Sequence, residues 1–314
     1  MRLVNYTDSS AQRTGLLFQE WLVDLRAASL YLSARSGDPV FSANESLWQP
    51  DWFVAADDFS RLLVQRLLAE LSACLPERRP ELLAEQVLIP PAEVEFLPAV
   101  CQPGKIVCVG LNYPEMGASQ PVLPPAYPTL FLKPVSALTG HGQPVRLPRA
   151  SREVFSEGEL ALVIGRRGMH IPPQQAHSYL AGYTIANDVG ARDWERRTSQ
   201  WTSGKLADTF CPLGPALVTA DEIPDPHDLL IRTRLNGEVI QEGSTARMIF
   251  NVPSLISYIS ELTTLEPGDL ILTGSPKGIG GLPARWVPMQ PGDTVAVEIE
   301  GLGALVNPVI AEEA

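Results

Sequence analysis

Residues 157–165 read Glu-Gly-Glu-Leu-Ala-Leu-Val-Ile-Gly, and residues 182–190 read Gly-Tyr-Thr-Ile-Ala-Asn-Asp-Val-Gly. Each stretch is a short apolar run bounded by glycine, a pattern typical of a strand that is buried on both faces. Residues two apart in a strand point to the same face, so we expect Glu157 and Glu159 to lie side by side. Asp188, at the end of the second run, is expected to join them from another strand.

Three carboxylates that pack together repel one another, and burying them is costly unless a cation neutralises them. A hard divalent cation such as Mg²⁺ prefers carboxylate oxygens, and three protein ligands leave positions open for water or substrate. The carboxylate and keto oxygens of a 2-oxo acid suit these positions, where the cation stabilises the enolate that forms when a bond beside the carbonyl breaks. The pattern therefore suggests a metal site, with an ordinary solvated strand face as the alternative.

The composition narrows the class of protein. A chain of 314 residues is long enough for one large or two modest domains, and 29 prolines with 24 glycines argue against a helical bundle. The formal charge of -12 makes nucleic acid an unfavourable partner. No apolar run approaches the roughly 20 residues of a membrane span, and the first residues lack the apolar stretch of a signal peptide. We therefore expect a cytoplasmic protein without a membrane partner.

The first hundred residues are predicted to form a small α/β domain. Residues 1–6 are typical of a strand, and Asp57 and Asp58 are suited to cap a helix over residues 59–75, whose apolar side chains recur every four positions. Residues 75–100 are rich in proline and charge, which favours a connection between domains. We place the boundary near residue 100, with a catalytic domain over residues 101–314.

Strands are predicted to dominate the second domain. Its expected elements are a buried strand over 105–110, a mobile loop over 111–125, a hairpin over 229–241 around Asn236-Gly237, a helix from about Pro253 that buries Leu255, Ile259 and Leu262, and strands over 270–273 and 294–299. The fold class that follows is α+β with a high strand content.

Two further segments carry candidate functional groups. Lys205 lies in Trp-Thr-Ser-Gly-Lys-Leu-Ala-Asp-Thr-Phe, where an ammonium near an enolate would hold negative charge or donate a proton. Residues 273–280 form a glycine-rich loop that is able to aim backbone N–H groups and the Ser275 hydroxyl at a carboxylate. An ordinary surface lysine and a plain turn are the alternatives for these two segments.

Eight motifs occur in order between Lys105 and Val309 and together resemble the fumarylacetoacetate hydrolase superfamily, in its 2-keto-4-pentenoate hydratase and 2-oxohepta-3-ene-1,7-dioate hydratase-like branch. They are Lys-Ile-Val-Cys-Val-Gly-Leu-Asn-Tyr at Lys105, Phe-Leu-Lys-Pro at Phe131, Glu-Gly-Glu-Leu-Ala at Glu157, Gly-Tyr-Thr-Ile-Ala-Asn-Asp-Val at Gly182, Gly-Lys at Gly204, Asp-Thr-Phe-Cys-Pro-Leu-Gly-Pro at Asp208, Leu-Asn-Gly-Glu-Val at Leu235 and Leu-Thr-Gly-Ser-Pro-Lys-Gly-Ile-Gly at Leu272. The resemblance implies bent mixed β-sheets, a Mg²⁺ or Mn²⁺ ion and a homodimer. Family members act on 2-oxo and β-diketo acids as hydrolases, decarboxylases, hydratases and isomerases.

The resemblance also implies roles for individual residues. It matches Glu157, Glu159 and Asp188 to the metal ligands, Lys205 to the active-site lysine, and Ser275, with Gly274 and Tyr113, to the residues that bind substrate. One departure concerns water activation: Met116 and Ser119 stand where hydrolytic and decarboxylating members carry a histidine and a glutamate. A thioether cannot accept a proton at neutral pH, and the adjacent Glu115 is the candidate replacement.

These observations favour an enzyme that acts on a 2-oxo acid through a metal-stabilised enolate. Carbon–carbon cleavage of an acylpyruvate or β-diketo acid comes first. The missing histidine favours the alternatives, which are tautomerisation or isomerisation, or hydration of an unsaturated 2-oxo acid. A catalytically reduced protein that keeps the metal and binds a ligand is a further alternative.

Overall fold

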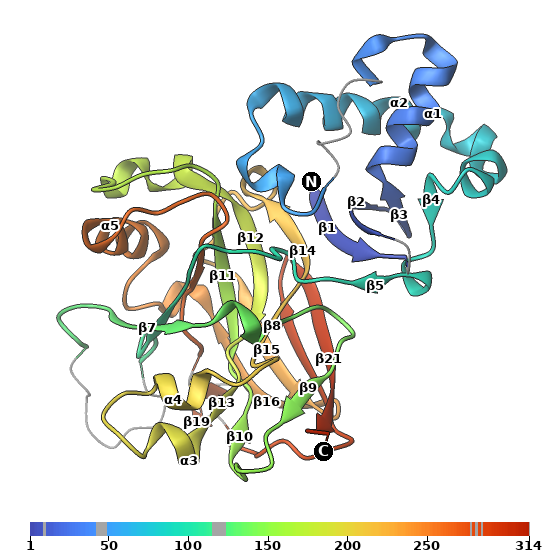
Figure 1. Cartoon of the computed structure of the whole chain (residues 1–314). Helices are drawn as coiled ribbons and strands as arrows, with labels where there is room; N and C mark the ends of the chain where they lie inside the picture. Colours follow the sequence, from blue (N-terminus) through green and yellow to red (C-terminus); the bar gives the residue numbers. More distant parts are fainter. Residues whose placement is uncertain are drawn as a thin grey trace.

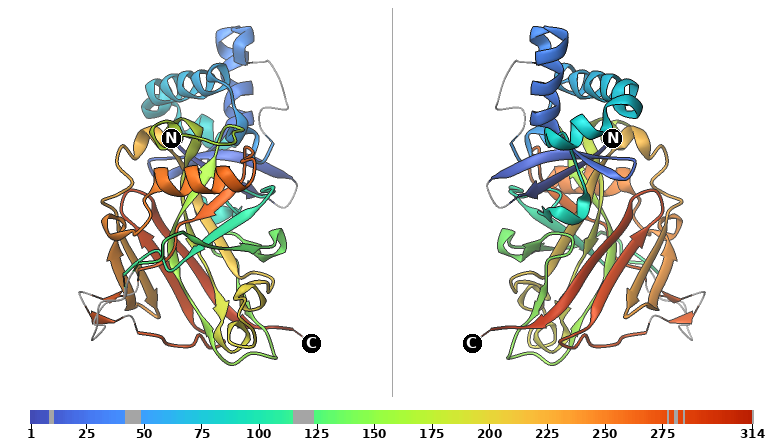
Figure 2. Two further views of the ribbon diagram at one scale, coloured as in Figure 1. Left: turned by 90° about the vertical axis from the view of Figure 1, so that its left-hand side faces the viewer. Right: turned by 90° about the vertical axis from the view of Figure 1, so that its right-hand side faces the viewer.

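The computed structural model describes residues 1–8, 11–41, 49–114, 124–276, 278–279, 282–283 and 285–313. Two large β-sheets pack against each other, with helices at one end and along one side (Figure 1). The side views in Figure 2 place helices α1 (Leu25–Ser36) and α2 (Asp58–Ala84) at one end of the molecule and the C-terminus at the opposite end. The predicted α+β architecture with mixed sheets is confirmed.

The larger sheet follows the order β4 (Leu88–Ile89), β3 (Trp21–Asp24), β2 (Gln12–Phe18), β1 (Arg2–Thr7), β14 (Cys211–Thr219), β12 (Leu180–Asn187), β11 (Gly158–Ile164), β17 (Leu270–Leu272), β6 (Ile106–Gly110) and β7 (Thr129–Lys133). The short strands β5 (Glu95–Phe96) and β8 (Leu138–Thr139) pair with β1 and β14. The smaller sheet follows β16 (Glu238–Ser244), β15 (Leu230–Leu235), β20 (Thr294–Ile299), β21 (Gly303–Ala311) and β9 (Val145–Leu147).

The remaining strands form two short pairs, β10 (Val154–Phe155) with β13 (Gly190–Ala191) and β18 (Gly278–Ile279) with β19 (Leu282–Pro283). The other α-helices that the structure describes are α3 (Arg192–Glu195), α4 (Thr202–Lys205) and α5 (Val252–Leu262). Helices α3 and α4 lie near the start of β11, at the end of the molecule away from α1 and α2 (Figure 1).

Strand β11 is buried on both faces, as its apolar run predicts. Leu160, Leu162 and Ile164 pack into a core shared with the smaller sheet and α5, whereas Ala161 and Val163 face the core that contains α1 and α2. The strand therefore separates two cores and has no solvated face. This explains why a continuous apolar run, without polar alternation, encodes it.

The first strands continue the larger sheet. Leu3 of β1 lies opposite Leu217 of β14, which in turn pairs with β12. The predicted strand over residues 1–6 is confirmed as β1. The division into two domains at residue 100 stays a prediction, which limited proteolysis tests.

The prediction of a connection from residue 75 onwards is wrong for its first ten residues. Helix α2 starts after Asp57, whose side chain caps it by accepting from the N–H of Ser60, and it continues to Ala84 through Pro76 and Pro80. Leu82, near its end, is fully buried in the core that also holds the earlier leucines of the helix. Packing of this last turn outweighs the hydrogen bonds that the prolines remove.

The local predictions in the second half are confirmed for the strands and the hairpin. β6, β17 and β20 occupy the expected segments, and Asn236 and Gly237 connect β15 to β16 with positive φ values of 52° and 84°. Helix α5 buries Leu255 and Ile259 as predicted, but Leu262 at its end is 60% exposed. As far as the chain is described, no helix has the length and apolarity to cross a lipid bilayer.

Burial of β11 leads to a stability prediction with a matched control. Leu162→Ala is expected to lower the free energy of unfolding by about 2–5 kcal/mol, because the side chain is fully buried and its removal leaves a cavity. The exposed Leu262→Ala should cost less than about 1 kcal/mol. Urea unfolding of both variants measures the difference, and equal losses would contradict the two-core description.

Candidate functional site

The antiparallel pairing of β11 with β12 brings three carboxylates together. Gly158, which lies between Glu157 and Glu159, pairs with Asn187, the residue before Asp188. The N–H of Asp188 donates to the carbonyl oxygen of Glu157 at 2.8 Å. One carboxylate oxygen from each of the three residues lies within 4.8 Å of the others. The structure therefore places the predicted trio at one point.

Three cations from the described part of the chain contact this trio. Lys205 Nζ lies 2.8 Å from Glu157 Oε2, 2.8 Å from Asp188 Oδ2 and 3.0 Å from the Asp188 carbonyl oxygen. Lys133 Nζ lies 2.7 Å from Asp188 Oδ1, and Arg192 Nη2 lies 2.7 Å from Glu157 Oε1. Lys133 and Lys205 are buried, so neither is an ordinary surface lysine. Asp188 is thus held between two buried ammonium groups.

The pKa shifts follow from this arrangement. Burial works to raise the pKa of Asp188, but Lys133 and Lys205 outweigh it and hold that pKa below its ordinary value. The pKa of Glu159 is raised well above its ordinary value by burial first and then by the charges of Asp188 and Glu157. Burial works to lower the pKa of Lys205, but Asp188 and Glu157 raise it, so this lysine carries its charge at neutral pH.

Glu159 is the carboxylate with the weakest compensation. Among the described residues, its hydrogen-bond donor is the backbone N–H of Gly274, at 2.8 Å from Oε2. Within the described ranges this buried carboxylate has no hydrogen-bonded cation of its own, and a cation bound to the trio would supply positive charge. Three carboxylate oxygens are the donors that Mg²⁺ and Mn²⁺ prefer, so the residues present fit a hard divalent cation.

The raised pKa of Glu159 gives a prediction for the metal-free protein. The folded state holds this proton more tightly than the unfolded state, so its stabilising effect is full below pH 4.5 and is lost as pH rises through the folded pKa. Glu159→Gln is therefore expected to raise the free energy of unfolding at pH 8, and to raise it less at pH 5. Denaturant unfolding in the presence of a chelator tests this, and a destabilised variant at pH 8 would contradict it.

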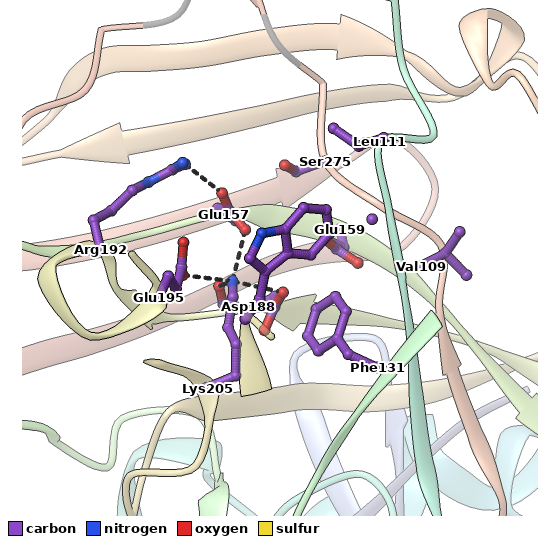
Figure 3. A pocket seen from close by; sticks show the side chains of 12 residues that line it. Val109, Leu111, Phe131, Glu157, Glu159, Asp188, Arg192, Glu195, Lys205 and Ser275 are labelled. Atoms are coloured by element: carbon purple, nitrogen blue, oxygen red, sulfur yellow. Dashed lines mark hydrogen bonds and ion pairs between the residues drawn. The ribbon is translucent and has the colours of Figure 1, made fainter. Parts of the chain in front are cut away.

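The trio opens into a cavity of about 140 Å³ whose labelled side chains are drawn in Figure 3. Its lining includes residues of β6 and β7, the start of β11 and the residue that follows β12. An apolar wall faces the charged groups and consists of Val109, Leu111, Phe131 and Trp201. Phe131 and Trp201 contact each other edge to face, with ring centroids 6.1 Å apart. The cavity therefore has charged groups on one side and apolar side chains on the other, which suits a small anion with a hydrocarbon part.

The other predicted site residues differ in whether they reach the cavity. Ser275 lines the cavity (Figure 3), whereas the backbone N–H of Gly274 is already donated to Glu159. Tyr113 is buried outside the cavity lining, and its hydroxyl is without a hydrogen-bond partner among the described residues. Glu115, Met116 and Ser119 lie outside the described residues, so the loop prediction stays open.

Three charged residues of the site had no predicted role: Lys133, Arg192 and Glu195. Lys133 belongs to the Phe-Leu-Lys-Pro motif, and its burial is visible only in the fold. Arg192 and Glu195 follow Asp188 closely and are three residues apart on α3, a spacing that places both on one side of a helix. That spacing, directly after a candidate metal ligand, was the available signal.

Comparisons with known proteins give consistent results. The family model described as fumarylacetoacetate (FAA) hydrolase C-terminal matches residues 105–310. The human mitochondrial protein oxaloacetate tautomerase FAHD2A is 46% identical over 247 residues, which cover 78% of this chain and 79% of that protein. The solved structure of 2-hydroxyhepta-2,4-diene-1,7-dioate isomerase from Mycobacterium marinum is 44% identical over 72% of this chain and 82% of its own, with a TM-score of 0.63.

A third comparison extends over the whole length. The structure of maleylpyruvate hydrolase from Sphingobium sp. SYK-6, in complex with manganese(II) and pyruvate, is 27% identical, covers 100% of both chains and has a TM-score of 0.68. The proteins that this chain resembles are thus named for two kinds of reaction, isomerisation and hydrolysis.

Proposed function

Because the chain is an enzyme that belongs to the fumarylacetoacetate hydrolase family, we propose that it interconverts the keto and enol forms of a small 2-oxo acid with the help of a divalent cation. The observation that carries this proposal is the buried Lys205 ammonium next to the carboxylates of Glu157 and Asp188, at the edge of a small cavity. An enolate needs fixed positive charge where its oxygen gains negative charge, and this group supplies it.

Glu157, Glu159 and Asp188 would hold the cation, and Mg²⁺ or Mn²⁺ fits their oxygen donors. When bound, the cation supplies Lewis-acid polarisation of the keto group, which stabilises the enolate. Lys205 keeps its proton at neutral pH and holds negative charge on the substrate oxygen. The Ser275 hydroxyl orients the substrate carboxylate, and the wall of Phe131 and Trp201 excludes water from the hydrocarbon part.

Tautomerisation is favoured over cleavage for two reasons. The tautomerase and isomerase comparisons are 46% and 44% identical, against 27% for the hydrolase. Tautomerisation also needs no activated water, which agrees with Met116 in place of a histidine. Among the described residues that line the cavity there is no histidine either.

Carbon–carbon cleavage is the second candidate. The full-length similarity to maleylpyruvate hydrolase favours it, because that protein covers the first hundred residues as well as the rest of the chain. An acylpyruvate would then be the substrate class, and a water molecule would have to be activated by a group other than the missing histidine.

One experiment separates the two candidates. The purified protein is mixed with Mg²⁺ or Mn²⁺ and with the enol forms of oxaloacetate and of several acylpyruvates, and the ultraviolet absorbance of the enol is followed while products are identified by chromatography. Tautomerisation accelerates the loss of enol absorbance and leaves the carbon skeleton whole. Two shorter products would support cleavage, and no turnover with any substrate would overturn both reactions.

The resemblance also leads us to propose a homodimer. Light scattering coupled to gel filtration measures the molar mass in solution. A homodimer predicts twice the mass of one chain. Cytoplasmic localisation likewise stays a prediction, and the human relative carries the word mitochondrial in its name.

A further inference from the structure

A fourth carboxyl group lines the cavity, that of Glu195 at the end of α3. Its side chain is 12% exposed, and Glu195 Oε1 lies 3.8 Å from Lys205 Nζ. Figure 3 shows the carboxyl group between Arg192 and Lys205, on the cavity side of α3. The group therefore sits next to the ammonium that we assign to the substrate oxygen.

Two glycines leave the room that Glu195 occupies. A Cβ atom at Gly190 would lie 2.4 Å from Glu195 Oε1, and a Cβ atom at Gly204 would lie 2.4 Å from Glu195 Cγ. Any larger residue at either position would displace the side chain. The Glu195 side chain therefore fits between the backbones of residues 190 and 204 because both residues are glycine.

Glu195 differs from the other carboxylates of the cavity in its partners. Glu157 and Asp188 are hydrogen-bonded to cationic groups, and Glu159 accepts from the Gly274 N–H. Within the described part of the chain, Glu195 makes the long ion pair to Lys205 and no hydrogen bond. Its oxygens are therefore available to exchange a proton with a bound molecule.

The surroundings of Glu195 also favour its protonated form. Burial raises the pKa of Glu195, the charge of Lys205 lowers it, and Glu157 raises it again, with a net rise above the ordinary value. Arg192, from the same helix, and Asp188, across the cavity, add smaller opposite effects. A carboxyl group with a raised pKa is better matched to acid–base work near neutral pH.

Building on the tautomerase function proposed above, we propose that Glu195 is the catalytic acid–base group that carries the proton between C3 and the C2 oxygen of the 2-oxo acid. In the direction from keto to enol, the Glu195 carboxylate takes a proton from C3. The electron pair of the C3–H bond forms the C2=C3 double bond, and the carbonyl π pair moves to the oxygen. Glu195 then returns the proton to that oxygen, which leaves the carboxylate and the enol.

This step balances without an external acid or base, because one proton leaves carbon and the same proton reaches oxygen. Lys205 stays charged throughout and stabilises the oxygen while it is negative. The role assigned to Glu195 requires no residue of the loop that carries Met116. It thus explains how the reaction proceeds without a histidine at that position.

The test compares Glu195→Gln with Glu153→Gln, which removes an exposed carboxylate that is paired with Arg196 outside the cavity. We expect kcat for enol loss to fall about 100- to 10,000-fold in Glu195→Gln with KM unchanged. Calorimetric affinities for Mn²⁺ and for oxalate, an analogue of the enolate, should stay within threefold of wild type. Glu153→Gln should match wild type throughout.

A second variant guards against a purely structural effect. In Glu195→Ala, added formate should restore part of the rate, because a free carboxylate then takes the vacated place. An unchanged kcat in Glu195→Gln, or a loss of kcat that follows a loss of Mn²⁺ or oxalate binding without rescue by formate, would overturn the role of Glu195. Inactive wild-type protein would instead overturn the tautomerase function, and the role of Glu195 with it.

Discussion

Lys205→Met is expected to reduce kcat for tautomerisation by about 100- to 1,000-fold, the usual effect of removing a group that stabilises an oxyanion. The Lys205 ammonium lies 2.8 Å from both Glu157 and Asp188, and their charges keep it protonated. Methionine preserves much of the volume and removes the charge. Steady-state kinetics at saturating metal measures the loss.

The conservative variant Lys205→Arg serves as the control for charge. It keeps the charge in a wider group and should retain more activity than Lys205→Met, although the buried site limits its fit. Circular dichroism checks that both variants fold. If a folded Lys205→Met protein kept the wild-type kcat, the lysine would have no part in stabilising the enolate.

Glu157→Gln is expected to weaken Mn²⁺ binding by about 100-fold or more, since even residues that only support a metal ligand change affinity 10- to 100-fold. Glu157 is the most accessible member of the trio, with its side chain 17% exposed, so the variant should fold. Titration calorimetry on the metal-free protein measures the affinity directly.

Glu153→Gln is the matched control for metal binding, because Glu153 lies four residues earlier and pairs with Arg196 at the surface. Its Mn²⁺ affinity should equal that of wild type. Equal affinities for Glu157→Gln and wild type would remove Glu157 from the proposed ligands.

Local patterns in the sequence predict much of the fold. The apolar runs of β11 and β12, the Asn236-Gly237 turn and the cap at Asp57 depend on neighbours in the chain, and each appears as expected. The family that the ordered motifs resemble is confirmed by the match over residues 105–310. Patterns of this kind need no knowledge of distant contacts.

Long-range packing explains the predictions that are wrong. Proline normally ends a helix, but α2 passes through Pro76 and Pro80 because Leu82 packs against a core built from remote strands. The pairing of β1 with β14 joins residues more than 200 positions apart, and no local pattern encodes it. Leu262 continues the apolar period of α5 yet lies where the core ends.

Some residues of the candidate site were predictable from local sequence patterns, and others were not. Glu157 directly precedes β11 and Glu159 is its second residue, and antiparallel pairing with β12 adds Asp188. Lys133, Arg192 and Glu195 reach the cavity from separate elements, so their convergence requires the fold. Tyr113 illustrates the opposite case, because the resemblance implies that it binds substrate, whereas in the structure it lies outside the cavity lining.

The buried charges of the site lower the stability of the metal-free protein, as expected of groups that serve function. Three carboxylates near one another destabilise the metal-free protein, and Lys133, Lys205 and Arg192 offset part of that repulsion. Glu159 keeps an unfavourable position that a bound cation would relieve. This is the pattern expected of a site that is built to hold a metal rather than to stabilise the fold.

Exchange of the C3 protons of a 2-oxo acid with deuterium, followed by proton NMR in ²H₂O, tests the central claim most directly. Pyruvate, 2-oxobutyrate and oxaloacetate are each incubated with the Mn²⁺- or Mg²⁺-loaded protein, and the paramagnetic ion is removed before the spectra are recorded. The proposed enolisation predicts that wild-type protein accelerates the loss of the C3 signal, and that a chelator or Glu157→Gln abolishes the acceleration. Exchange at the protein-free rate for all three acids would contradict it.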